Sequence, residues 1–423
     1  MSAVRATDNG EASIDLDWVR ANFPALGKVS ARGPVIYLDN PAGTQVPRRC
    51  IDGISSYLSE GSANSHGCFE SSRQTDEIIA EARRGMAALL GGEPHEIAFG
   101  PNMTTLTYAL SRALARRFEP GDEIIVSELD HDANVSPWLA LEERGVVVRQ
   151  IPILPHDCTL DLAAFERLLS PRTRLVAVGH CSNALGTINP VARIAELAHR
   201  VGALVWVDAV HSVPHVPIDV HALGADFLVC SAYKFFGPHL GILWGRAELM
   251  EQVRAYQVRP APQTSPEKFE TGTKNHECLA GLVGTLEYLR ELGRRTAAQA
   301  GDARRELVHA LDAIQRYELG LSAALSDGLA SVPGLRLYGI GERSRLAERV
   351  PTFSFTIDGL GSAEISARLA EQSIYSWAGN YYAFLVMQRL GLADGAVRVG
   401  AVHYNTLREV ERLIDALRGL ARR

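Results

Sequence analysis

Between about residues 85 and 250, the hydrophobic positions of the chain alternate between two patterns. Stretches with apolar residues at helical spacing separate short apolar runs typical of buried strands, which include EIIVS (123–127), VVVRQI (146–151), RLVAVGH (174–180), ALVWVD (203–208) and DFLVCS (226–231). Two of the helical stretches are 103–118 and 190–202, and the second begins with proline and ends with glycine. This alternation predicts a mainly parallel sheet that is covered by helices on both faces.

The pattern changes in the last third of the chain. A long helical stretch from about 277 to 330 leads to PGLRLYGI and VPTFSFTIDG, which alternate like half-exposed strands, and the chain ends in an amphipathic helical pattern. We therefore expect a flexible arm over 1–15 and a large domain over 16–300, whose N-terminal segment lines a pocket or packs on a smaller domain. That smaller α+β domain is expected over 301–423.

Composition narrows the class of protein. The chain has 423 residues, 46% of them hydrophobic, and a formal charge of -6, which is enough for two domains with a large core. Scattered basic residues argue against nucleic acid, and the lack of a long apolar run argues against a membrane span. The N-terminus has no signal-peptide pattern, and the six cysteines lack metal-ligand spacing. These features predict a cytoplasmic protein with reduced thiols.

Polar residues follow several of the predicted strands. His131, Asn183, Asp208 and Lys234 each come after an apolar run. Each has an ordinary structural explanation on its own, as a helix cap, a turn residue, a solvated histidine or a lysine at an apolar rim. However, parallel strands end at one edge of the sheet, where ligands of α/β proteins bind. Their convergence there favours a binding site.

The chemistry of these residues indicates a particular ligand. Lys234 at a desolvated rim has a lowered pKa and can attack an aldehyde, while Asp208 suits a protonated pyridine nitrogen and a flat histidine can stack on a ring. Gly100, Thr104 and Thr105 stand at a helix start, where N–H groups and hydroxyls bind phosphate. Together these are the partners that pyridoxal phosphate needs.

The chain also resembles a known family. From VIYLDNPAGTQVP to VRVGAVHYNTLREVERLI it is similar to the class V aminotransferase and cysteine desulfurase family of fold type I pyridoxal-phosphate enzymes. The motifs that carry the resemblance are DHDANVSPW, SNALGTINPV, VDAVHSVPHVPIDVHALGADF and CSAYKFFGPHLGILWG. The resemblance implies an α/β fold of type I, pyridoxal 5'-phosphate as cofactor, no metal, and a homodimer with shared active sites.

The resemblance also implies roles for individual residues. Lys234 matches the Schiff-base lysine, Asp208 the partner of the pyridine nitrogen, and His131 the ring-stacking histidine and candidate acid or base. The resemblance also implies that Asn183 and His211 contact the phenolic oxygen of the cofactor. The residues that it implies at the phosphate are Thr104, Thr105, Ser231 and Tyr233, together with Thr273, which contacts the phosphate of the neighbouring subunit. Substrate contacts fall to Arg398 at the α-carboxylate, and to Asn40, Asn183 and Tyr382.

One departure from the family pattern affects the reaction. Desulfurases of the family carry a persulfide cysteine on a mobile loop, and the matching stretch YSWAGNYYAFLVM (375–387) has no cysteine. Tyr382 aligns with that nucleophile, and a phenol cannot carry a persulfide. The nearest other thiol in the N-terminal part of the predicted pocket is Cys68, for which an ordinary loop or core position is favoured. Possible second acids are Tyr381, Tyr382 and His66.

We therefore expect a cysteine desulfurase-like enzyme, a C–S lyase acting on cysteine or an S-substituted cysteine. A class V aminotransferase or an epimerase acting on a small amino acid is the alternative. A non-catalytic scaffold is disfavoured, because it has no need for intact Lys234, Asp208, His131 and Arg398. A Rossmann dehydrogenase is disfavoured because no strand is followed by GxGxxG, and a metalloenzyme because Asp208 is better used on the pyridine.

Overall fold

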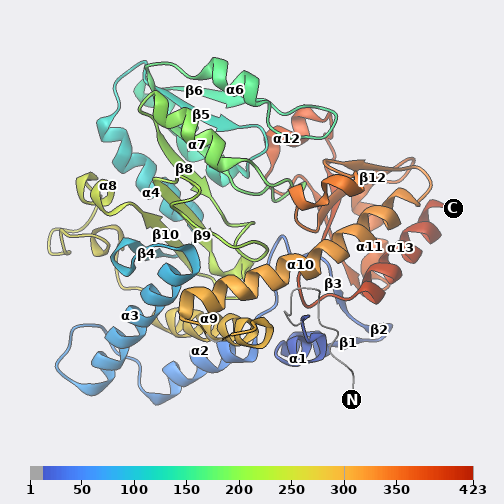
Figure 1. Cartoon of the computed structure of the whole chain (residues 1–423), viewed down its shortest axis with the longest axis horizontal. Helices are drawn as coiled ribbons and strands as arrows, with labels where there is room; N and C mark the ends of the chain where they lie inside the picture. Colours follow the sequence, from blue (N-terminus) through green and yellow to red (C-terminus); the bar gives the residue numbers. More distant parts are fainter. Residues whose placement is uncertain (1–12, 300, 423) are drawn as a thin grey trace.

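The computed structural model describes residues 13–299 and 301–422. Figure 1 shows a large α/β layer joined to a smaller one, with the helix α10 (Ala303–Ala330) running between them. Most of the arm predicted over 1–15 lies outside the described residues. The domain limits at 300 and 301 stay a prediction. None of the helices in the described ranges is long and apolar enough to cross a membrane.

The larger sheet is mainly parallel, as predicted. It has seven strands in the order β4 (Ile97–Gly100), β10 (Gly241–Gly245), β9 (Phe227–Ser231), β8 (Leu204–Asp208), β7 (Thr173–Gly179), β5 (Glu123–Ser127) and β6 (Val147–Ile151). Only β10 runs antiparallel to its two neighbours. In β8 and β7, Asp208 lies opposite Gly179, so these two strands end together at one edge.

Helices cover both faces of this sheet because its strands are apolar on both sides. One hydrophobic core includes residues of α4 (Met103–Leu114) and α5 (Ser136–Leu139). The opposite core includes residues of α3 (Glu70–Leu90), α7 (Val191–Arg200) and α9 (His276–Thr296). The helices predicted over 103–118 and 190–202 are thus confirmed, although the first ends at Leu114 and continues as a 3-10 turn. Further helices are α1 (Leu16–Ala21), α2 (Arg48–Glu60), α6 (Leu162–Leu168), α8 (Ala247–Gln252) and α12 (Phe384–Arg389).

The smaller sheet is antiparallel and lies in the C-terminal part of the chain. Its order is β11 (Leu335–Tyr338), β12 (Thr352–Ile357), β15 (Ala396–Gly400) and β14 (Trp377–Gly379). A third core fills the space between this sheet and the helices α10, α11 (Ser362–Ala370) and α13 (Leu407–Ala421). A two-stranded ladder, β1 (Val29–Ser30) with β2 (Gly33–Pro34), precedes all of these strands in the chain.

The N-terminal segment reaches this smaller sheet. Strand β3 (Ile36–Tyr37) pairs in parallel with β13 (Ile374–Tyr375), and Asp39 bridges to Gly400 at the end of β15. The next residues pack so closely that a Cβ atom at Gly400 would overlap the ring of Pro41. Residues 39–42 are thereby held between the smaller sheet and the carboxyl edge of the larger one.

Candidate active site

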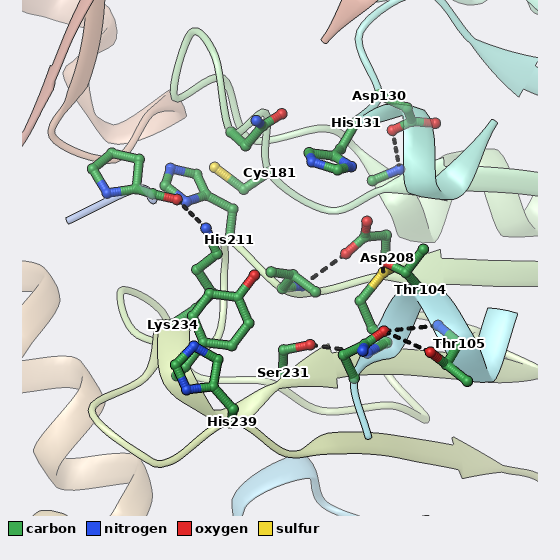
Figure 2. A pocket seen from close by; sticks show the side chains of 17 residues that line it. Thr104, Thr105, Asp130, His131, Cys181, Asp208, His211, Ser231, Lys234 and His239 are labelled. Carbon is green, nitrogen blue, oxygen red and sulfur yellow. Dashed lines mark hydrogen bonds between the residues drawn. The ribbon is translucent and has the colours of Figure 1, made fainter. Parts of the chain in front are cut away.

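A cavity of about 540 Å³ lies at the carboxyl ends of the parallel strands. His131 reaches it from the loop after β5, Asn183 from the loop after β7, Asp208 from the end of β8, and Lys234 from the 3-10 turn after β9. Figure 2 shows His131, Asp208 and Lys234 around this space. The sequence-based prediction that these strand ends meet at one site agrees with the structure.

Lys234 is held by backbone carbonyl groups. Its Nζ donates hydrogen bonds to the carbonyl oxygens of Pro41 and Ala42, the second at 2.8 Å (Figure 2 draws the first). Burial lowers the pKa of Lys234 to about 7, and the positive charge of Arg398 acts in the same direction. Since only a neutral amine is nucleophilic, this pKa makes Lys234 reactive towards a carbonyl carbon near neutral pH.

Asp208 shares its end of the cavity with a second carboxyl group. Val210 N donates to Asp208 Oδ1 at 2.9 Å, and burial raises the pKa of Asp208 to about 6. Asp130 accepts a hydrogen bond from Gly179 N at 2.5 Å; burial first, and then the charge of Asp208, raise its pKa to about 8. Asp130 was not among the predicted site residues. Its position directly before His131, after a strand, is the signal that could have identified it.

The hydrogen bond of His131 indicates which ring nitrogen carries the proton in the neutral ring. Its Nδ1 accepts from Ala133 N at 3.0 Å, so in the neutral ring the proton lies on Nε2. Burial, followed by the charges of Lys234 and Arg398, lowers the pKa of His131 to about 4. His131 is therefore a neutral flat ring with one donor. This geometry favours stacking and hydrogen-bond donation over the acid or base role that was also predicted.

The first turn of α4 forms another wall of the cavity. Asn102 caps the helix by accepting from Thr105 N at 2.8 Å and from Thr105 Oγ1 at 3.0 Å. Ser231 Oγ accepts from Met103 N at 3.0 Å, which leaves its own proton free to be donated. A helix N-terminus favours an anion by its dipole and its N–H groups. Thr104, Thr105 and Ser231 thus lie together, as predicted. Asn102 lies beside them and was not among the predicted residues.

Tyr233 lines the main cavity, whereas Thr273 lines a neighbouring one. The Tyr233 ring stacks on His239, with centroids 4.9 Å apart and planes at 16°, and both residues line the cavity. His239 was not predicted. Thr273 lines a neighbouring cavity of about 270 Å³, which shares Thr105 and His239 with the main one. Its predicted contact with the phosphate of a neighbouring subunit stays a prediction.

His211 and Asn183 contact the smaller sheet and its loops. His211 Nε2 is hydrogen-bonded to Thr352 Oγ1 at 2.9 Å, and burial holds the pKa of this buried ring well below its usual value. Asn183 Nδ2 donates to Tyr381 O at 2.9 Å, while its Oδ1 has no partner among the described residues. Both line the cavity, as predicted.

Three predicted substrate contacts are not found in the wall of the cavity. Asn40 N–H groups donate to the carbonyl oxygens of Tyr37 and Gly400, and its Oδ1 accepts from Tyr404. The amide of Asn40 is thus used in this buried network, and its predicted contact with a substrate stays a prediction. Tyr382 is 72% exposed and stacks on His131, with ring centroids 5.5 Å apart.

Arg398 lies behind the cavity and is almost fully buried. Its Nη1 donates to Asn183 O at 3.0 Å, its Nη2 lies 3.4 Å from Asp39 Oδ1, and the Tyr381 ring covers the guanidinium at 4.4 Å. Asp39 was not among the predicted site residues, because its pairing depends on β15 reaching the N-terminal segment. In the resting protein, Arg398 already has a carboxylate partner.

The loop between β14 and α12 has no thiol. Tyr381 and Tyr382 both adopt left-handed backbone conformations, with φ of 54° and 56°, and Tyr382 O accepts from Asp132 N at 2.6 Å. Cys68 is exposed and does not line the cavity, whereas Cys181, which was not predicted, does. Burial raises the pKa of the Cys181 thiol, so this group keeps its proton.

The fold and the site define a class of protein. A desolvated amine, a buried carboxyl group, a flat neutral imidazole and a helix N-terminus around one cavity fit the aldehyde, ring nitrogen, ring face and phosphate of pyridoxal phosphate. The sequence profile of the class V aminotransferase family matches residues 36–413. The chain therefore belongs to the class V aminotransferase family, whose members are pyridoxal-phosphate enzymes of this mixed α/β fold.

Individual relatives carry two kinds of name. A protein of Mycolicibacterium paratuberculosis called a probable cysteine desulfurase is 33% identical over 96% of this chain, which spans only 58% of that relative's length. The aminotransferase-like protein FGM3 of Gibberella zeae is 34% identical over 96% of this chain and 98% of its own. The structure of an apo cysteine desulfurase from Thermococcus onnurineus superposes with a TM-score of 0.85 and 27% identity over the whole of both chains.

Proposed function

We propose that the protein is a pyridoxal-phosphate-dependent, cysteine desulfurase-like lyase that cleaves the Cβ–S bond of cysteine or of an S-substituted cysteine. The observation that carries this proposal is the shared cavity of Lys234, with a pKa of about 7, and Asp208. The names of the desulfurase relatives support it. When bound, the cofactor supplies an electron sink for the bonds of the substrate Cα.

The residues of the chain would bind the cofactor and the substrate and remove a proton from the substrate. Asp208 would accept a hydrogen bond from the ring nitrogen and keep its proton in place, while the N-terminus of α4 and Ser231 would bind the phosphate. Lys234 Nζ, once free of the cofactor, removes the proton from the substrate Cα, because His131 has no unshared ring nitrogen to act as base. Arg398 binds the substrate carboxylate.

The fate of sulfur follows from the loop at 379–383. No thiol stands there to accept sulfur, because the loop carries Tyr381 and Tyr382. We therefore propose elimination, in which the electron pair left by the Cα proton forms a Cα=Cβ double bond, the Cβ–S bond breaks with its pair on sulfur, and the sulfur takes up a proton. Water then hydrolyses the unsaturated amino acid to pyruvate and ammonia. The product is a thiol or sulfide, without transfer of sulfur to the protein.

The alternative reaction is amino transfer or epimerisation on a small amino acid. Two observations favour it. The loop lacks the sulfur acceptor, and the relative FGM3, which this chain matches over 98% of its length, is named an aminotransferase-like protein. In that case the proton that Lys234 removes from Cα returns at another carbon or on the other face.

One experiment tests the cofactor and the reaction together. The purified protein, incubated with pyridoxal phosphate, should gain a visible absorption band that the Lys234→Ala variant does not gain. The loaded protein is then supplied with L-cysteine and cysteine S-conjugates, and sulfide, thiol, pyruvate and alanine are measured against keto-acid-dependent amino transfer. A release of sulfur no faster than with free cofactor, while another amino acid turns over, would exclude the lyase. Tyr382→Cys tests whether only a sulfur acceptor is missing.

Assembly and location are part of the same proposal. We propose a cytoplasmic homodimer in which Thr273 of each copy completes the phosphate site of the other. Gel filtration and light scattering of the loaded protein, compared with Thr273→Ala, test this arrangement: the dimer should persist in the variant while its affinity for pyridoxal phosphate falls.

A further inference from the structure

Residues 39–42 contact both cations of the proposed site. The carboxylate of Asp39 lies 3.4 Å from Nη2 of Arg398, and the carbonyl oxygens of Pro41 and Ala42 accept the hydrogen bonds of Lys234 Nζ. The same four residues thus contact the amine that would react with a cofactor aldehyde and the guanidinium that would bind a substrate carboxylate.

This stretch is fixed at its centre. The side chain of Asn40 is hydrogen-bonded to Gly400 and Tyr404, and Gly400 approaches Pro41 so closely that a Cβ atom there would overlap the proline ring. The side chain of Asp39 is less confined, since it is 25% exposed whereas that of Arg398 is 4% exposed. Asp39 can therefore turn towards solvent while the backbone and Arg398 stay in place.

Arg398 keeps capacity for a further ligand. Its Nη1 is bound to Asn183 O, but its Nε is buried without a partner among the described residues. A guanidinium with one occupied nitrogen, one shared with an internal carboxylate and one unpaired is suited to exchange that carboxylate for another in a two-point contact.

We propose that Asp39 is an internal competitor for the substrate carboxylate, which holds Arg398 in the resting protein and is displaced when an amino acid binds. This inference rests on the proposed function, because it takes Arg398 as the carboxylate-binding residue. Asp39 is then a specificity-determining residue. It lowers the affinity for every ligand that places a carboxylate on Arg398.

The test compares two amines on the loaded protein. L-alanine carries a carboxylate and ethylamine does not, and both perturb the absorption band of the bound cofactor, from which their dissociation constants are read. Asp39→Asn removes the competing charge with little change in shape, and Asp39→Glu restores the charge. We expect Asp39→Asn to bind L-alanine about tenfold more tightly and ethylamine with unchanged affinity. Asp39→Glu should return the wild-type ratio of the two constants.

The possible outcomes separate the proposals. If Asp39→Asn weakens both amines equally, or leaves the ratio unchanged, Asp39 is not a competitor, and the inference fails while the proposed function stands. Asp39→Ser, which also removes the charge, decides the matter in the same way if the asparagine variant does not fold. If the wild-type protein gains no cofactor band at all, the proposed function fails, and this inference fails with it.

Discussion

The reactivity of Lys234 should depend on pH in an unusual range. Its pKa is about 7 where the ordinary lysine value is 10.5. At pH 7, about half of the Lys234 side chains are then neutral, compared with about 0.03% of ordinary lysines. Covalent attachment of pyridoxal phosphate to the apo-protein should therefore proceed about a thousandfold faster near pH 7 than attachment to an exposed lysine.

The assay is the rate at which the visible band appears when apo-protein is mixed with excess cofactor at a series of pH values. The rate should rise with a midpoint near pH 7, because only the neutral amine attacks the aldehyde. Reduction with borohydride followed by peptide mass analysis confirms that the label is on Lys234. Lys234→Ala is the matched control and should give no band.

Two variants should shift the midpoint pH in opposite directions. Arg398 lowers the pKa of Lys234 and Asp208 raises it. The midpoint should therefore move up in Arg398→Met and down in Asp208→Asn, each by less than about one pH unit for charges that do not touch the amine. A wild-type midpoint above about pH 9 would mean that burial does not perturb this amine, and the explanation of its reactivity would be wrong.

Further predictions concern stability and cofactor binding. The pKa of Lys234 is lower in the folded protein than in the unfolded chain, so between pH 7 and 10.5 the unfolded chain binds more protons. Lys234 therefore destabilises the fold by up to about 5 kcal/mol below pH 7. This penalty becomes smaller as the pH rises towards 10.5. In urea unfolding of apo-proteins, Lys234→Met should thus gain stability over wild type at pH 6 and lose that advantage towards pH 10.5; a pH-independent difference would contradict this. Asn102→Ala removes the cap of α4 and should cost about 1 kcal/mol of unfolding free energy and weaken cofactor binding, measured by dialysis; Asn102→Asp keeps the cap and is the control for the unfolding measurement. His131→Phe should still bind the cofactor covalently and keep its visible band, since His131 is a neutral ring; loss of the band would show that its Nε2 proton is needed. Gly400→Ala should destabilise the fold by about 2 kcal/mol in thermal unfolding, because the new methyl group meets Pro41.

The strand-end residues could be predicted from the sequence because their positions follow from regular structure. Asp208 is the last residue of β8 and Lys234 ends the turn that follows β9, and parallel strands necessarily end at the same edge. The mainly parallel sheet could be predicted for the same reason. The resemblance to the family then added roles for residues such as Ser231 and His211, which periodicity does not single out.

Other features depend on contacts between distant parts of the chain. Asp39 pairs with Arg398 only because residues 36–39 run beside 373–375 and end at Gly400, and no local pattern encodes that approach. Asn40 is part of the same junction, so its amide is used internally. Asp130 resembles any polar residue after a strand until the structure places it near Asp208.

The parallel pairing of β3 with β13 also determines when the pocket can be completed during synthesis. Ile36 N bonds to Ser373 O and Leu38 N to Tyr375 O, so an early part of the nascent chain pairs with one made more than three hundred residues later. A ribosome-bound chain that has emerged only as far as Lys234 has the lysine but lacks the partner that fixes the Pro41 and Ala42 carbonyls. The pairing that fixes these carbonyl groups is therefore completed only late in synthesis, and a truncation before residue 373 removes it.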